Sequence, residues 1–188
     1  MAATPAQRVL FHGVTGSGKT SAARAYAQAV GLPFHPADDV VGWLPEWRKR
    51  PVEEQRKIAA AIAAGDRWVV DSAWSSVREL LLARAELVVA LDYPRWLSLG
   101  RLLRRTVRRC ITGEQVCNGN TETWRLVLSR DSIIVWHFRS FAAKRQSLAA
   151  MKADPGMPPV ISFWRPRDLE AWIAEAGQAT GAAETSAR

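Results

Sequence analysis

Cysteine is scarce in this chain, and long apolar runs are absent from it. The two cysteines, Cys110 and Cys117, are too few for a disulfide framework. No stretch of about 18 uninterrupted apolar residues occurs, which argues against a membrane span. The N-terminus also lacks the charged and then apolar pattern of a secretory signal. We therefore expect a cytoplasmic protein without a membrane partner.

Internal repeats and domain linkers are missing as well. A length of 188 residues, with 48% hydrophobic and 23% charged residues, is typical of a single globular domain. We predict that this domain spans residues 1–176. The remaining residues, 177–188, are small and polar, and we expect them to form a disordered tail.

Acidic residues are outnumbered, because 18 of them face 26 basic residues and the net charge is +8. Residues 93–113 contain no acid at all, although they contain Arg95, Arg101, Arg104, Arg105, Arg108 and Arg109. This balance favours an anionic partner, either a nucleic acid or a small phosphorylated ligand.

Short apolar segments alternate with segments of helical periodicity. The pattern predicts strands at 8–11, 34–35, 68–70, 87–91 and 160–163. It predicts helices at 20–30, 51–64, 95–109 and 122–151, the last one broken once, and a final helix from Pro166. Strands that alternate with helices indicate an α/β fold, in which a parallel sheet is covered by helices on both faces.

The strongest motif follows the first predicted strand. Residues 13–20 fit the pattern G-x-x-x-x-G-K-[ST] at every required position. In such a loop, glycines let consecutive N–H groups turn toward phosphate oxygens, and the next helix directs its positive end to the same point. The motif predicts binding of ATP or another nucleoside triphosphate with Mg²⁺. The expected nucleotide-binding residues are Gly13, Val14, Thr15, Gly16, Ser17, Gly18, Lys19, Thr20 and Ser21.

Within this loop, Lys19 is expected to reach the β- and γ-phosphates, and Thr20 to ligate Mg²⁺. Asp39, Asp71 and Asp92 follow predicted strands, at the sheet edge where ligands bind in open α/β folds. We assign Asp71 to the metal together with Thr20. Asp39, or its neighbour Asp38, suits an acceptor role, orienting a hydroxyl or taking its proton. The alternative for each aspartate is a turn or helix cap.

The predicted helix from Arg95 carries apolar residues on one side and arginines on the other. We expect Arg101 and Arg105 to be catalytic, because arginines lower the energy of a phosphoryl group in transfer. With the Gly/Asn-rich loop that follows, this helix would form a mobile lid over approximately residues 100–122. The alternatives are a solvated face and a nucleic-acid-binding stripe.

Several segments occur in the order of a known family. They are the phosphate loop, 34–39 with Trp43 and Trp47, 68–71, 91–95 followed by Arg101 and Arg105, 118–122, Trp136 and 160–172. In these segments the chain resembles adenylate-kinase-like P-loop proteins, and among them the small bacterial topology modulation (FlaR-like) proteins. The resemblance covers most of residues 8–175. It implies a three-layer P-loop NTPase fold with a five-stranded parallel sheet, an acceptor pocket near Asp39 and Asp71, and a helical lid.

One departure from that family concerns the acceptor. Adenylate kinases carry Asp-Gly-Phe-Pro-Arg after the third strand, whereas this chain has Asp71-Ser72-Ala73-Trp74 and lacks the arginine that grips the acceptor phosphate. We therefore predict a kinase-like phosphotransferase whose small-molecule acceptor is unknown. The alternative is a nucleotide-dependent regulator or nucleic-acid-binding ATPase without such an acceptor.

Overall fold

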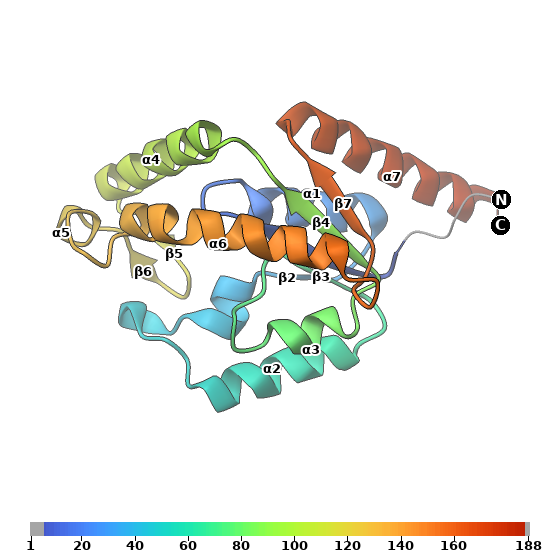
Figure 1. Cartoon of the computed structure of the whole chain (residues 1–188), viewed down its shortest axis with the longest axis horizontal. Coiled ribbons are helices and arrows are strands. Elements are labelled where there is room, and N and C mark those ends of the chain that lie inside the picture. Colours follow the sequence, from blue (N-terminus) through green and yellow to red (C-terminus); the bar gives the residue numbers. More distant parts are fainter. Residues whose placement is uncertain (1–5, 187–188) are drawn as a thin grey trace.

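The five predicted strands form one parallel sheet in the computed structural model, which describes residues 6–186 (Figure 1). The strands are β1 (Arg8–Gly13), β2 (Phe34–His35), β3 (Trp68–Val70), β4 (Leu87–Leu91) and β7 (Val160–Phe163). Their order across the sheet is β2-β3-β1-β4-β7, and every neighbouring pair is parallel. The predicted α/β fold with a five-stranded parallel sheet is thus confirmed. Because β1 is central, the loop that follows it lies at the middle of the sheet's C-terminal edge.

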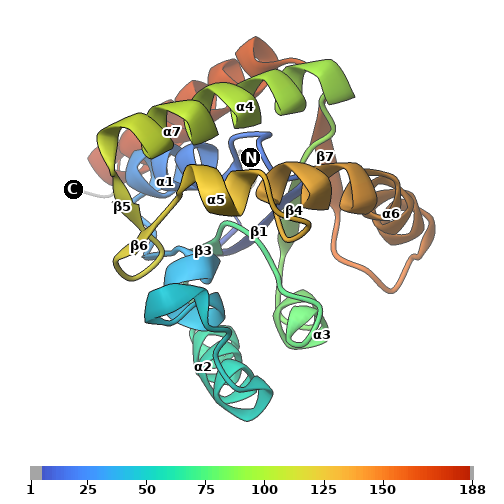
Figure 2. The same ribbon diagram turned by 90° about the vertical axis from the view of Figure 1, so that its left-hand side faces the viewer.

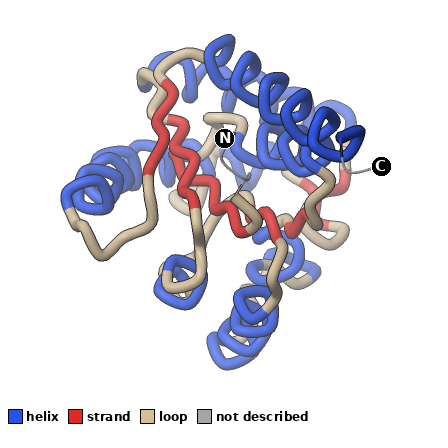
Figure 3. The backbone as a smooth tube through the Cα atoms, turned by 90° about the vertical axis from the view of Figure 1, so that its right-hand side faces the viewer, coloured by secondary structure: helices blue, strands red, loops and turns tan. Residues whose placement is uncertain are grey.

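Helices cover both faces of the sheet, as Figures 2 and 3 show from the two sides. They are α1 (Lys19–Val30), α2 (Val52–Ala64), α3 (Arg78–Leu82), α4 (Arg95–Thr112), α5 (Trp124–Val127), α6 (Ile133–Ala153) and α7 (Pro166–Ser186). A short antiparallel hairpin, β5 (Gln115–Val116) and β6 (Asn120–Thr121), separates α4 from α5. Along the described residues, no helix is long and apolar enough to cross a membrane.

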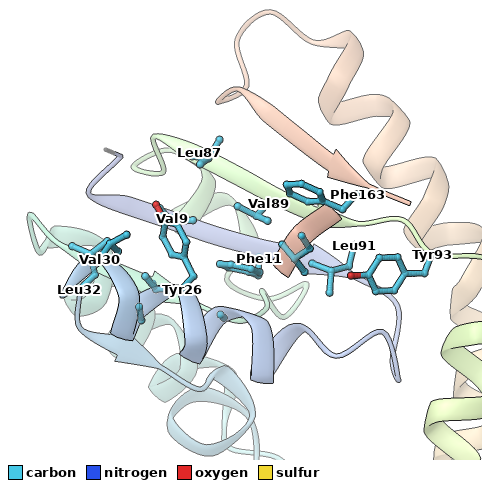
Figure 4. Close-up of a cluster of buried hydrophobic side chains, with 14 residues drawn as sticks. Val9, Phe11, Tyr26, Val30, Leu32, Leu87, Val89, Leu91, Tyr93 and Phe163 are labelled. Atoms are coloured by element: carbon cyan, nitrogen blue, oxygen red, sulfur yellow. The ribbon is translucent and has the colours of Figure 1, made fainter. Parts of the chain in front are cut away.

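Alternate residues of the strands supply two separate cores. Val9 and Phe11 of β1 point to the side where Tyr26 of α1 and Leu169 of α7 pack (Figure 4). Leu10, between them in sequence, joins a second cluster with residues of α2, α3 and α6. Strands buried on both faces carry nearly continuous apolar runs, which is why 87–91 is apolar throughout.

Three parts of the described chain differ from the sequence-based expectation. The helix α3 and the hairpin β5–β6 are too short to leave a periodic pattern, and they were not predicted. The predicted disordered tail is wrong for residues 177–186, because α7 continues as a helix to Ser186. Gly177 lies against Ala29, since a Cβ at position 177 would stand 3.2 Å from the Ala29 Cβ, and this small-residue contact extends the packing of α7 on α1. Residues 187–188 lie outside the described part of the chain.

Candidate nucleotide and acceptor site

The phosphate loop joins β1 to α1 and depends on glycine at defined positions. Gly16 and Gly18 have φ values of +82° and +94°, a region that side chains rarely adopt. A Cβ on Gly16 would lie only 2.4 Å from the carbonyl oxygen of Ser98 in α4. The loop is therefore packed directly under the first turns of α4. Inside the loop, the buried Ser17 donates its hydroxyl to the Val14 carbonyl at 2.8 Å.

Lys19 is half-buried at the first position of α1. Its Nζ donates a hydrogen bond to the Val14 carbonyl at 2.8 Å, which holds the side chain across the loop. Burial lowers the pKa of Lys19 to about 8, and the positive charge of Lys144 is the next contribution in the same direction. A bound anion would oppose both contributions, because a nearby negative charge favours the protonated lysine.

The two residues predicted to hold the metal lie next to each other. The Thr20 hydroxyl hydrogen-bonds to the carboxylate of Asp71, whose Oδ1 also accepts the backbone N–H of Ala37 at 2.8 Å. Asp71 is only 3% exposed, and burial raises its pKa. Mg²⁺ binds hard oxygen ligands and keeps several waters, so one hydroxyl and one carboxylate beside the triphosphate fit this ion.

The neighbours Asp38 and Asp39 have different surroundings. Asp38 is exposed, its Oδ1 accepts the indole N–H of Trp74 at 3.0 Å, and its charge acts on Lys19 and Arg105. Asp39 is half-buried instead. Burial raises its pKa, and its carboxylate accepts a hydrogen bond from the Cys117 thiol. Asp38 is thus the carboxylate whose charge is felt across the phosphate site, whereas the sequence-based candidate Asp39 is turned toward the hairpin.

The third strand-end aspartate, Asp92, has a separate partner. Its Oδ1 lies 3.1 Å from Nε of Arg145 in α6. This ion pair joins the end of β4 to α6, and it supports the structural alternative for Asp92.

The arginines of α4 from Arg101 onward have different surroundings. Arg101 donates from Nη1 to the Ser17 carbonyl at 3.1 Å, which places its guanidinium on the phosphate loop. Arg105 is half-buried, and its Nε has no hydrogen-bond partner among the described residues. Burial is the main cause that lowers its pKa. Arg104 is exposed on the outer side.

Arg108 and Arg109, by contrast, have acidic partners beyond the acid-free segment. Arg108 pairs with Glu114 at 2.7 Å, and Arg109 pairs with the buried Glu122 at 3.0 Å. Residues 93–113 contain no acid, but the fold brings Glu114 and Glu122 next to these two arginines.

The apolar side of α4 faces outward. Trp96 is 74% exposed and Ile111 is 71% exposed, and the helix side between them also carries exposed Leu103 and Val107. The opposite side of α4 directs Arg101 and Arg105 to the loop. With this orientation, α4 directs positive charge toward the phosphate loop and leaves its apolar side chains exposed to solvent.

The segment 39–47, which belongs to the predicted acceptor side of the site, is held by the hairpin β5–β6. Asn120 is buried. Its amide oxygen accepts the backbone N–H of Trp47 at 2.6 Å, and its amide nitrogen donates to the Leu44 carbonyl at 2.9 Å. Asn118 donates to the carbonyls of Asp39 and Trp43, both at 2.6 Å. The predicted lid segment is thus in contact with the predicted acceptor segment.

Three tryptophans lie together beside Asp38. The rings of Trp43 and Trp74 meet edge to face with centroids 5.3 Å apart, and those of Trp43 and Trp47 do so at 5.5 Å. This cluster supplies flat apolar surface next to the carboxylate, in the region where we predict the acceptor site.

The helix α6 adds residues that sequence reasoning missed. His137, fully buried, donates from Nδ1 to the Thr15 carbonyl at 2.9 Å, and His12 donates from Nε2 to the Lys144 carbonyl at 3.2 Å. The available signal was the placement of polar residues 137 and 144 on the same helix face as the buried Phe141 and Leu148.

A phosphate loop after the central strand of a five-stranded parallel sheet is the arrangement of the three-layer P-loop NTPase fold. A shikimate kinase from Bacteroides thetaiotaomicron has this fold, with 13% identity, 93% of this chain and 98% of that chain covered, and a TM-score of 0.55. A sugar kinase from Janibacter sp. HTCC2649 has it with 21% identity, 92% of each chain covered and a TM-score of 0.52. A gluconokinase from Sinorhizobium meliloti 1021 matches at a TM-score of 0.49 with 20% identity, over 92% of this chain and 89% of that chain. No protein-family model matches the chain, and no curated protein matches it.

Proposed function

We propose that this protein transfers the terminal phosphoryl group of ATP, or of another nucleoside triphosphate, to a hydroxyl of a small molecule. The observation that supports this function is the convergence of Lys19, the Thr20–Asp71 pair and Asp38 at the C-terminal edge of the sheet. Nucleotide binding alone needs only the loop. Asp38, a carboxylate whose charge acts on Lys19, would in addition serve to bind and activate an acceptor hydroxyl.

Each group in the site has a role in this proposal. Lys19 and the loop amides hold the phosphates, and Thr20 with Asp71 holds Mg²⁺, which neutralises phosphate charge when bound. Arg101 and Arg105 stabilise the charge that spreads over the transferred oxygens. Asp38 orients the acceptor hydroxyl and takes its proton, with Asp39 beside it as the second acceptor-side carboxylate.

The proposed acceptor is a small molecule that carries a hydroxyl group. Two proteins of the same fold are named as a shikimate kinase and a sugar kinase, and both names describe small hydroxyl-bearing acceptors. The segment 71–74 lacks the phosphate-gripping arginine of adenylate kinases. We therefore propose a hydroxylated metabolite and not a nucleoside monophosphate. Free Cys110 and Cys117 are consistent with activity in the reducing cytoplasm.

The test is thermal unfolding with Mg–ATP, Mg–GTP and a panel of hydroxylated metabolites, followed by a phosphotransfer assay. A triphosphate should raise the melting temperature by mass action, and the right acceptor should raise it further. The Lys19→Ala variant should lose the triphosphate shift and the transfer. An unchanged transfer rate in this variant would refute the assignment.

The alternative, a regulator that binds nucleic acid, uses the same arginines differently. Its mark would be polynucleotide binding that weakens steeply with salt. The inward direction of Arg101 and Arg105 supports phosphotransfer for these two residues. Salt-dependent polynucleotide binding without any acceptor effect would favour the regulator.

A further inference from the structure

The helix α6 lies against β1 and the phosphate loop, and it contacts both through residues of one face. His137 contacts the loop at the Thr15 carbonyl, and the backbone of Lys144 contacts His12 at the end of β1. These two positions are two helical turns apart and therefore lie on the same face. Leu148, one turn further along that face, is buried in the core with Leu10. Lys144 thus occupies the inner face of α6, beside the loop.

Lys144 is a half-buried cation without an acidic partner close enough for an ion pair in the described part of the chain. The charges that act on it are those of Arg78, which is like, and Asp38, which is opposite. Burial is the main cause that lowers its pKa. Lys144 is in turn the strongest of the charges that act on Lys19. Two like charges held together and away from water raise the free energy of the empty protein.

An anion between the two lysines would relieve this cost. The group that Lys19 is expected to hold is the terminal phosphate. We propose that Lys144 is a second phosphate-binding lysine, which reaches from α6 to contact the terminal phosphate of the triphosphate. This inference rests on the proposed function. Arg101 and Arg105 approach the same group from α4. Lys144 keeps its proton throughout, because the transfer breaks the bond from phosphorus to the bridging oxygen, forms one to the acceptor oxygen, and moves the hydroxyl proton to Asp38.

The experiment compares the affinities of the full-length protein for Mg–ATP and Mg–ADP by calorimetry. Removing one charge-assisted contact to the terminal phosphate should weaken Mg–ATP binding roughly 10- to 100-fold in Lys144→Ala. Mg–ADP, which lacks that phosphate, should change less than about threefold, and Lys144→Arg should recover most of the ATP affinity. The matched control is Lys152→Ala, which removes the same charge from an exposed position of α6 and should leave both affinities unchanged.

Equal weakening of ATP and ADP binding, or no weakening of either, would overturn the inference. If Lys144→Ala does not fold, the near-isosteric Lys144→Gln gives the same comparison. The proposed function fails separately, if the wild-type protein binds no triphosphate or if it transfers no phosphoryl group to any acceptor of the panel. A wild-type protein that binds Mg–ATP while Lys144→Ala and Lys144→Gln bind it equally well would remove the role of Lys144 alone.

Discussion

The phosphate side and the acceptor side of the site are built in different ways. The phosphate side is one continuous segment, 13–20, whose shape follows from glycine conformations and from backbone groups of its own. The acceptor side joins segments 73 to 79 residues apart through the amides of Asn118 and Asn120. A local motif specifies the shape of the loop, to which Arg101 and His137 add hydrogen bonds from α4 and α6. The second side has no such motif and depends on long-range hydrogen bonds. We therefore expect the two sides to respond separately to substitution.

The largest effect should come from the acceptor carboxylate. Asp38→Asn keeps the hydrogen bond from Trp74 but removes the base, and phosphotransfer should fall roughly 10²- to 10⁴-fold. Mg–ATP affinity should not fall, because the contacts of the phosphate loop remain intact. Steady-state kinetics with the identified acceptor measures both quantities. Asp39→Asn is the matched control, and a larger loss of rate in that variant would reverse the assignment of the two neighbours.

On the phosphate side, the next largest effect is expected at Gly16. Gly16→Ala would force a side chain into positive φ and against the Ser98 carbonyl, which should cost about 3 kcal/mol of unfolding free energy. Gly100→Ala is the control, since Gly100 lies in α4 with nothing within 4 Å of an added Cβ. That change should stabilise the protein by roughly 0.5–1 kcal/mol. Urea unfolding measures the unfolding free energies of the two variants. Similar values for both would show that the loop is not packed under α4.

The hairpin contact should have a smaller effect that is confined to the acceptor side. Asn120→Ala would leave the Trp47 N–H and the Leu44 carbonyl without their partner, at a cost of about 2 kcal/mol. Acceptor affinity should fall while Mg–ATP affinity stays within about threefold. Calorimetry with each ligand tests this separation. Loss of both affinities together would mean that the two sides are coupled.

The last effect, of about the same size as that of Asn120→Ala, concerns pH and His12. Burial lowers the pKa of His12 to about 4 from the ordinary 6.5. Between these values the unfolded chain binds a proton that the folded protein does not, so stability is full above pH 6.5 and falls as the pH drops toward 4. The loss should reach about 2 kcal/mol at pH 5. Urea unfolding at pH 7 and pH 5 should show a smaller pH dependence in His12→Asn, and an identical dependence would contradict the buried neutral state.

Most of the fold could be predicted because its signals are local. The strands are apolar runs that end at Asp71, Asp92 and the loop glycines, and their alternation with helices requires a parallel sheet. The phosphate loop was predicted with its flanking elements, and the fold was confirmed. The roles of individual site residues stay predictions until they are measured.

Long-range features could not be predicted in the same way. Periodicity separates the apolar and basic sides of α4, but it does not say which side faces the protein. An amphipathic helix ordinarily turns its apolar side inward, whereas here Trp96 and Ile111 face solvent and Arg105 is half-buried near the loop. The asparagines of the hairpin were likewise interpreted as loop residues, because their partners in segment 39–47 are distant in sequence.

The contact between His12 and α6 has a consequence for how this protein could diverge. His12 binds the backbone carbonyl of residue 144 and not its side chain. The position of α6 therefore does not depend on which amino acid occupies position 144. Natural variants could exchange a lysine for an arginine or a neutral residue there, and so adjust the phosphate affinity, while the helix keeps its place beside the loop.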